Sequence, residues 1–524
     1  MGLEQVARQH PRRAPAGPGH RAGCLRVVRN LRARARAHIT HHRWFALALA
    51  AGAVLRLTAA LGYPGALWFS DSFVYLGAAL RLQPSPERMV GYSFFLRTLE
   101  PFHSLALVTG VQHLMGLGIA VMIYALAVGS AVPRGLACLA AVPVLADGFE
   151  IEDEHMIMAE TVFIFLVMLA MLLIVRRGRV SWPTTLLAGV IAGCAVDVRT
   201  EGLPLLVLFA AFLLLRGSNG APARDGRRKR LGWMAAGTMV LGCAVPVLAY
   251  MGWFHAWTGE YALTRSEGLY LWGRASSFAE CPVIRPPADE RALCPSGPPS
   301  SRTPPGDLIW HAPQVLRLAG GPVSAANDAL LRDFALRAVK AQPLGYLRSV
   351  LGGLARSVQW PRQPYPDADI AYFYSFHPAP EAIPADRSWV PGGTPFQDAV
   401  QYGHASPSRV VEPFAIVMTQ YERWFFTYGP LFGLILLTGL GGVVRIRRSP
   451  ARLTWCRRSG SMLPWTTAMV LLVFPIATAD FDYRYLLPVL PFAGLAAALS
   501  FAPVRGYSPP PPPPPPPLLP PPPP

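Results

Sequence analysis

The chain has 524 residues, of which 52% are apolar and only 15% are charged. A soluble protein of this length carries roughly a quarter charged residues, so the composition excludes an ordinary soluble globular protein. The formal net charge of +18 would favour nucleic-acid binding in a soluble protein. Here the arginines stand in short blocks between apolar runs, as in the cytoplasmic loops of membrane proteins. We therefore expect a membrane protein that binds no nucleic acid.

Residues 1–43 form a strongly basic N-terminal segment. The segment is too long for the basic region of a cleavable signal peptide, and many apolar runs follow it. We therefore expect it to stay attached and, by the positive-inside rule, to lie in the cytoplasm. The excess of arginine over lysine is typical of a bacterium with a GC-rich genome, in which the inner membrane is the expected location.

Ten apolar runs follow, and a bilayer core needs roughly 20 apolar residues per helix. Arginine blocks come after the fourth, sixth and eighth runs, and alternating spans from a cytoplasmic N-terminus place all three blocks inside. The prediction is an all-α polytopic inner-membrane protein with about ten transmembrane helices. The fifth and sixth runs are short and form either a tight hairpin or one broken helix. The expected spans are 44–62, 104–129, 132–148, 156–175, 184–200, 203–215, 232–257, 424–444, 462–479 and 485–502.

This topology divides the chain into four further parts after the basic segment. A transmembrane region at 44–257 contains the first outer loop at 63–103. A large extracytoplasmic loop at 258–423 precedes the C-terminal transmembrane helices at 424–502. The tail at 503–524 is nearly pure proline and predicts solvated polyproline II without a fold of its own.

The extracytoplasmic loop has two features of its own. From Asp328 to Trp360 apolar residues recur at helical spacing, which predicts an amphipathic helix that lies on the membrane surface or packs within the loop. The rest is rich in proline and glycine and is expected to be irregular. Cys281 and Cys294 lie close together in it, and an oxidising compartment favours a disulfide over two free thiols. The cysteines form no cluster with zinc-site spacing, so no metal site is predicted.

Ionisable groups at or beside membrane depth are costly unless they face a cavity or a partner. In the predicted topology they gather near the outer side, whereas the acids of the second outer loop (147–155) are expected to be solvated. The outer groups either pair as internal salt bridges or serve a site. A carboxylate can deprotonate an acceptor hydroxyl, and guanidinium groups can stabilise a phosphate leaving group. The groups are Arg56, Asp71, Glu160, Asp197, Arg199, Glu201, Asp480, Asp482 and Arg484.

At these residues the chain resembles the GT-C superfamily of membrane glycosyltransferases, in the branch of protein O-mannosyltransferases and aminoarabinose transferases. The resemblance covers about residues 43–250 and 424–502. Ser72 stands where the family more often has a second acid in its first-loop motif. The matching elements are Asp71 in Ser70–Tyr75, the stretch Gly91–Leu96, Glu160 at the start of the fourth span, and Arg484 in Arg484–Pro488.

The resemblance implies an inverting transfer from a polyprenyl-phosphate-linked sugar to the hydroxyl of a glycan, lipid or protein acceptor outside the cell. Asp71 would be the general base, and Glu160 would position the acceptor or share that task. Arg199 and Arg484 are the expected phosphate ligands. The further substrate-binding candidates are Arg56, which lies deeper in the first span, and Tyr75. Some relatives use a divalent metal and others none, and no ligand spacing here demands one, so the cofactor is open.

Two other interpretations stay open. A transporter or lipid flippase also places charges in a membrane cavity, but such proteins usually contain an internal repeat with paired broken helices, and the two halves of this chain do not match. A non-catalytic cell-envelope assembly protein could keep the same fold, and Ser72 in place of the second acid is compatible with it.

Overall fold

The computed structural model describes residues 42–175, 181–218, 226–380, 382–386, 388, 390–404, 409–447 and 455–503. Within these residues the regular structure is helical, apart from one isolated parallel β-bridge between Leu67 and Met156. The all-α class is therefore confirmed for the described residues. Nearly all of the basic N-terminal segment, the arginine block after the fourth span and nearly all of the proline-rich tail lie outside them.

Each predicted span coincides with an apolar helix. Four helices in the described part of the chain are long and apolar enough to cross a membrane, and a fifth span results if the bent pair α20 (Phe414–Trp424) and α21 is one. The remaining apolar helices are shorter, and the chain is a multi-pass membrane protein. The helices are α2 (Arg43–Gly62), α5 (Leu105–Gly129), α6 (Arg134–Ala146), α8 (Glu160–Val175), α9 (Trp182–Val198), α10 (Gly202–Ser218), α11 (Gly226–Thr258), α21 (Gly429–Arg447), α22 (Trp455–Thr478) and α23 (Leu490–Leu499).

The predicted boundaries are wrong at the last spans. The eighth was expected to begin at residue 424, but α20 ends there and the chain bends by 60° before α21. The tenth was expected to begin at residue 485, where the chain instead forms the short 3₁₀ helix η5 (Tyr483–Leu486) before α23. Pro430, Pro488 and Pro491 lack the backbone N–H that a helix interior needs, which accounts for late helix starts at these places.

Close backbone packing holds the middle helices together. A Cβ atom at Gly189 of α9 would overlap the carbonyl oxygen of Met239 in α11, and one at Gly242 of α11 would overlap that of Leu186. Small residues allow this approach between apolar helices, where lipid leaves no hydrophobic driving force. Helices α9 and α10 also pack on each other and both pack on α11. The fifth and sixth runs are therefore a hairpin rather than one broken helix.

The segments outside the apolar helices are more ordered than expected. In the predicted first outer loop, α3 (Ser70–Arg81), α4 (Gly91–Leu99) and η1 (Glu100–Phe102) follow one another, and α7 (Gly148–His155) forms the predicted second outer loop. The loop 258–423, expected to be largely irregular, contains α12 (Glu267–Ser276), α13 (Cys281–Ile284), η2 (Arg291–Leu293), η3 (Pro299–Ser301), α14 (Pro305–His311), α15 (Pro313–Leu316), α16 (Ala325–Ala341), α17 (Pro343–Ser357), α18 (Ala368–Phe373) and α19 (Pro395–Gly403).

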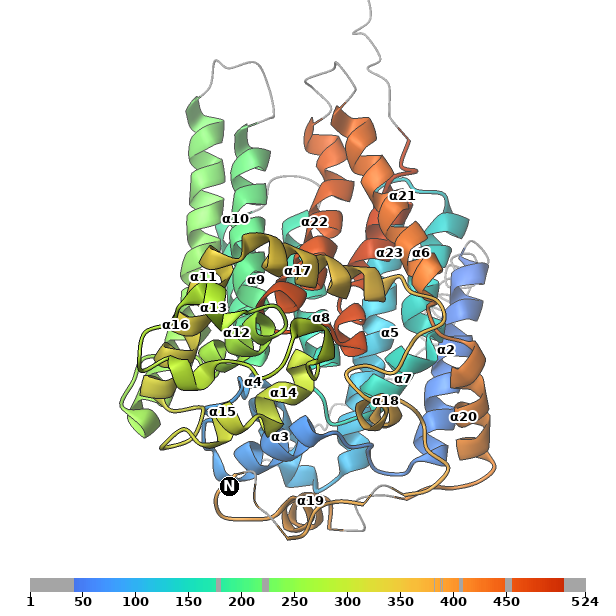
Figure 1. The fold of residues 1–524 in the computed structure, drawn as a ribbon. Helices are drawn as coiled ribbons and strands as arrows, with labels where there is room; N and C mark the ends of the chain where they lie inside the picture. Colours follow the sequence, from blue (N-terminus) through green and yellow to red (C-terminus); the bar gives the residue numbers. More distant parts are fainter. Residues whose placement is uncertain are drawn as a thin grey trace, which may run out of the picture.

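The loop has its own small core. Trp272 of α12 and Phe334 of α16 are fully buried in it, and a disulfide joins Cys281 to Cys294. The expected single amphipathic helix is instead the pair α16 and α17, divided at Pro343, because proline disfavours helical backbone in the residue before it. Figure 1 shows α12, α14, α15, α18 and α19 on the same half of the molecule as α3 and α4, and α17 crossing in front of α22 nearer mid-height, while α10, α11, α21 and α22 extend to the other end.

Candidate active site

Asp71 lies in the first turn of α3, and the start of this helix is fixed by its own sequence. Phe69 is extended, and its backbone N–H donates a hydrogen bond of 2.9 Å to the Ser72 hydroxyl. The bridge between Leu67 and Met156 holds the preceding residues against the second outer loop. Ser72, the third residue of α3, therefore caps the start of the helix that carries Asp71 through the backbone N–H of Phe69.

Two arginines bind the Asp71 carboxylate, which is 5% exposed. Arg484 Nη1 lies 2.9 Å from Asp71 Oδ2, and Arg88 Nη1 forms a second ion pair with the same oxygen. Burial by itself raises the pKa of Asp71, but the charges of Arg88 and Arg484 and their hydrogen bonds outweigh it and lower the pKa to about 2. Asp71 is therefore firmly ionised, and it is a weak base as long as both arginines bind it.

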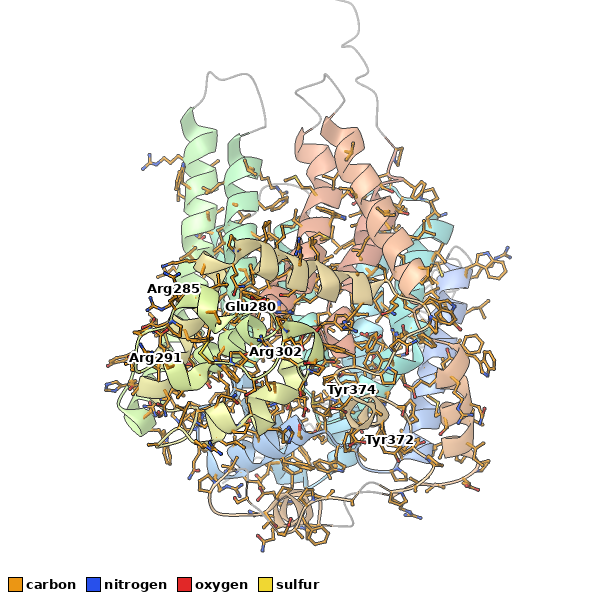
Figure 2. The ribbon with its side chains drawn as sticks, in the orientation of Figure 1. Glu280, Arg285, Arg291, Arg302, Tyr372 and Tyr374 are labelled. Carbon is orange, nitrogen blue, oxygen red and sulfur yellow. A yellow bond between two sulfur atoms is a disulfide. The ribbon has the colours of Figure 1, made fainter. Side chains whose placement is uncertain are left out.

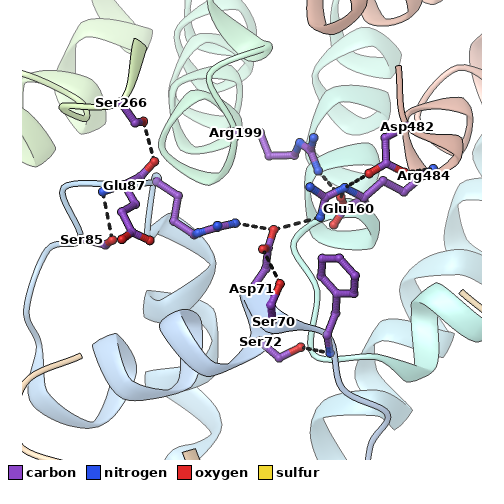
Figure 3. A network of polar contacts seen from close by, with 12 residues as sticks. Ser70, Asp71, Ser72, Ser85, Glu87, Glu160, Arg199, Ser266, Asp482 and Arg484 are labelled. Atoms are coloured by element: carbon purple, nitrogen blue, oxygen red, sulfur yellow. Dashed lines mark hydrogen bonds and ion pairs between the residues drawn. The ribbon is translucent and has the colours of Figure 1, made fainter. Parts of the chain in front are cut away.

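Arg484 joins Asp71 to a second set of charges. Its Nε lies 3.3 Å from Asp482 Oδ2 and 3.9 Å from Glu160 Oε1. Glu160 is fully buried and also forms an ion pair with Arg199, whose Nη2 lies 2.9 Å from Glu201 Oε1. Figure 3 shows Glu160, Arg199, Asp482 and Arg484 converging beside Asp71. The structure thus brings together six of the nine outer groups singled out in the sequence, namely Asp71, Glu160, Arg199, Glu201, Asp482 and Arg484.

Glycine helps to bring the first outer loop to Arg199. A Cβ atom at Gly91, the first residue of α4, would overlap the carbonyl oxygen of Asp197 at the end of α9. Tyr75 lies one turn after Asp71 and is buried, with its ring 5.1 Å from the ring of Tyr92. Its backbone oxygen accepts a 2.8 Å hydrogen bond from Ser93. Helix α4, which begins at Gly91, therefore packs against α3 and holds it in place.

A cavity of about 300 Å³ opens onto this network. Asp71, Arg88, Asp482 and Arg484 line it, while Glu160 contacts these residues through Arg484. The opposite wall comes from the loop 258–423, with Tyr270, Asp307, Ile309, Trp310 and Asp367. The alternative that the outer charges pair internally is correct for these groups, yet the pairs face a cavity rather than a sealed core.

Arg56 lies outside the network. It is 3% exposed and forms an ion pair of 2.5 Å with Glu154. Glu154 also contacts His113 Nδ1 at 2.9 Å, and His113 Nε2 lies 2.9 Å from His155 Nδ1. His155 Nε2 in turn donates to the Tyr63 carbonyl oxygen at 2.7 Å. This buried chain fastens α7 to α2 and α5.

The acids of the second outer loop were expected to be solvated, and this expectation is wrong. Glu150, Glu152, Asp153 and Glu154 are each at most 5% exposed, because α7 packs against α2, α5 and α20. Burial and the neighbouring carboxylates Glu154 and Asp153 raise the pKa of Glu150 well above its ordinary value. Because α7 has only eight residues, its sequence shows no hydrophobic periodicity that would predict a buried helix.

Sequence reasoning missed Arg88. Its segment is held in place by the start of the large loop, since Ser266 Oγ donates to the Glu87 carbonyl at 2.6 Å and the Arg265 N–H donates to that of Pro86 at 2.7 Å. An arginine in a loop that the predicted topology places outside runs against the positive-inside bias, and this makes Arg88 noticeable in the sequence. Arg81 gives the same signal but pairs with Asp398 instead.

No group of three or more His, Cys, Asp and Glu side chains is placed to hold a metal ion within the described ranges.

Residues 100–261 match the protein family described as dolichyl-phosphate-mannose-protein mannosyltransferase. The match confirms the resemblance to the GT-C superfamily. The matched region contains Glu160 and Arg199, whereas Asp71 and Arg484 lie outside it on either side.

Among solved structures, the chain is similar to the archaeal oligosaccharyltransferase AglB from Archaeoglobus fulgidus, in complex with an inhibitory peptide and a dolichol-phosphate. The TM-score is 0.37 and the identity 10%, over 87% of this chain and 50% of that one. The chain thus spans about half the length of AglB, and so low a similarity carries no argument about the site. A search of curated proteins finds no match.

Proposed function

We propose that the chain is an inverting membrane glycosyltransferase that moves a sugar from a polyprenyl-phosphate-linked donor to an extracytoplasmic acceptor hydroxyl. One observation carries the proposal: a buried carboxylate, Asp71, and two guanidinium groups, Arg88 and Arg484, line the same cavity. The family match supports the class of donor, because that family is named for a lipid-phosphate sugar.

In the proposed reaction the donor phosphate binds Arg88 and Arg484, with Arg199 behind them. The acceptor oxygen forms a bond to the anomeric carbon of the sugar while the bond from that carbon to the phosphate oxygen breaks. The electron pair leaves with the phosphate, whose growing charge the guanidinium groups stabilise. The acceptor proton passes to Asp71. The products are the glycosylated acceptor and polyprenyl phosphate.

The ion pairs of Asp71 suggest an order for these events. A carboxylate whose pKa is about 2 accepts a proton poorly at neutral pH. A donor phosphate competes with Asp71 for Arg88 and Arg484, and the loss of either ion pair lets burial raise the pKa of the carboxylate. Donor binding would therefore strengthen the base, and the free enzyme would hold Asp71 inactive.

The main role of Glu160 would be to position Arg199 and Arg484. It is fully buried and contacts both Arg199 and Arg484, so it holds two cations at the place where the phosphate charge develops. A contact of Glu160 with the acceptor, as the resemblance implies, stays a prediction. Arg56 would have a structural role and would not bind substrate, because its guanidinium already forms an ion pair with Glu154.

We propose the ten-span topology with a cytoplasmic N-terminus in the inner membrane. It places the Asp71 cavity and the loop 258–423 on the outer side. The location of α3, α4, α12, α14, α15, α18 and α19 on one half of the molecule supports this (Figure 1). The donor's lipid would then stay in the bilayer while its sugar reaches the cavity.

The test is label transfer by the purified full-length protein in lipid nanodiscs, given polyprenyl-phosphate donors with a radiolabelled sugar and a panel of acceptors. Wild type should transfer label, and Asp71→Asn should lower the rate by about 10²- to 10⁴-fold. Asp398→Asn is the matched control, because it breaks another arginine–carboxylate pair of α3, that with Arg81. No transfer with any donor would contradict the proposal, as would equal transfer by wild type and Asp71→Asn.

A further inference from the structure

A second cavity lies behind the segment that carries Asp482 and Arg484. Its volume is about 480 Å³, which is within the range of small-molecule sites. Tyr483 lines this cavity, whereas its neighbours Asp482 and Arg484 line the cavity of Asp71. The residues 482–484 therefore separate two cavities. The wall of the second is largely aromatic, with Phe149, Tyr372, Tyr374, Phe376, Phe426 and Tyr483.

Arg362, a cation in this wall, forms no direct ion pair among the described residues. Its guanidinium lies 4.7 Å from the ring centre of Phe426, 5.0 Å from that of Tyr483 and 5.6 Å from that of Phe149. It donates one hydrogen bond, of 3.2 Å, to the carbonyl oxygen of Thr427. In the part of the chain that the structure describes, no carboxylate lies within ion-pair distance of it. Arg88, Arg199 and Arg484 each have such a partner.

The nearest acids are bound to the backbone instead. Asp147 accepts hydrogen bonds from the backbone N–H groups of Phe149 at 3.0 Å and Thr427 at 2.7 Å. Glu422 accepts one from the N–H of Phe376 at 2.8 Å. Burial lowers the pKa of Arg362, and the charges of Asp147 and Glu422 offset this effect only in part. An anion in the cavity would supply the missing charge, and a cationic ligand would be repelled.

The rim of the cavity suits a lipid. Tyr372 at the rim is 56% exposed, and the flanking Trp360, Trp424 and Phe425 are 55%, 70% and 58% exposed. These rings adjoin the bend between α20 and α21, and aromatic rings of this kind gather at the membrane–water interface. Figure 2 shows Tyr372 in α18 and Tyr374 at its end, on the half of the molecule that also carries α2 and α20.

We propose that this second cavity binds the phosphate headgroup of an anionic bilayer lipid, with the phosphate on Arg362 and the start of the acyl chains on the exposed rings. Guanidinium groups bind phosphate through paired hydrogen bonds, and Arg362 has donors left for them. A single hydrogen bond connects this cavity to the proposed site of the sugar donor: the hydroxyl of Tyr374, which lines the second cavity, donates to Asp482, which lines the first, at 2.9 Å. The inference concerns a separate cavity and does not depend on the proposed transfer reaction.

The experiment is native mass spectrometry of the purified full-length protein, titrated separately with phosphatidylglycerol, phosphatidylcholine, polyprenyl phosphate and inorganic phosphate. Wild type should bind phosphatidylglycerol, and Arg362→Met should weaken this binding by about tenfold or more. Arg362→Lys should recover part of it. Arg356→Met is the matched control, because Arg356 also stacks on an aromatic ring, that of Tyr365 at 4.2 Å, but does not line the cavity. This variant should bind phosphatidylglycerol as wild type does.

Three results would overturn the inference. Equal binding of phosphatidylglycerol by wild type and Arg362→Met excludes a role for this guanidinium. Equal binding of phosphatidylcholine excludes selection for an anionic lipid. Arg362-dependent binding of polyprenyl phosphate or inorganic phosphate without phosphatidylglycerol excludes a bilayer lipid as the occupant. Because none of these measurements needs sugar transfer, a failure here is separate from a failure of the proposed reaction.

Discussion

Replacing Arg88 by glutamine tests how the site controls its base. Arg88 and Arg484 together hold the pKa of Asp71 at about 2 instead of the ordinary 3.8. At about 1.4 kcal/mol per pH unit, this difference amounts to about 2 kcal/mol in favour of the carboxylate. Burial opposes it, so losing Arg88 alone should return the pKa of Asp71 to 3.8 or above. The acid limb of kcat/KM, which reports the free enzyme, should rise by about two pH units.

Arg88→Gln should also lower the stability of the fold, by an amount that depends on pH. A carboxylate with a lowered pKa stabilises the fold above pH 3.8 and loses this contribution as the pH falls through about 2. Arg88→Gln should therefore lower the free energy of unfolding by about 2 kcal/mol at neutral pH, and this loss should vanish in strong acid. The shift of the acid limb is measured by radiolabel transfer as a function of pH. Arg81→Gln is the control, because Arg81 lies on α3 with Asp71 but pairs with Asp398. An acid limb that does not move in Arg88→Gln would refute this role of the ion pair.

Two further substitutions give independent checks. Arg484→Lys should lower kcat/KM by about 10²- to 10³-fold in the transfer assay, because a single ammonium cannot contact Asp71, Glu160 and Asp482 together as the guanidinium does; near-wild-type activity would contradict the network. Ser72→Ala should lower the unfolding free energy by about 1 kcal/mol, because the backbone N–H of Phe69 loses its hydrogen bond to the Ser72 hydroxyl. The measurement is a lower Tm in detergent. Ser72→Asn, which keeps a side-chain acceptor, should keep the wild-type Tm, and equal Tm values for the two variants would exclude the cap.

Membrane topology made part of this site predictable. The bilayer demands long apolar runs, so the spans can be read from composition, and the alternation of sides placed Asp71, Glu160, Arg199 and Arg484 near one face. The structure joins these four through direct ion pairs. Which side chains pair is a property of packing, and it could not be read from the sequence.

The ion pair of Arg88 and the burial of α7 could not be predicted from the sequence. Arg88 reaches Asp71 because Ser266, far along the chain, holds the segment before it. The acids of α7 look like a solvated loop, since nothing local to Glu150 or Glu154 reveals the helices that bury them. Arg56 carries a signal as strong as that of Arg199, yet it pairs with Glu154 instead. Short polar helices and long-range partners are set by tertiary contacts.

The central claim is that donor phosphate and Asp71 compete for Arg88 and Arg484. The most direct measurement is equilibrium binding of a radiolabelled polyprenyl-phosphate sugar to wild type and Asp71→Asn in nanodiscs, beside transfer by the same preparations. The competition predicts that Asp71→Asn binds the donor at least as tightly as wild type while failing to transfer the sugar. Weaker donor binding by a folded Asp71→Asn protein, or transfer at the wild-type rate, would contradict it.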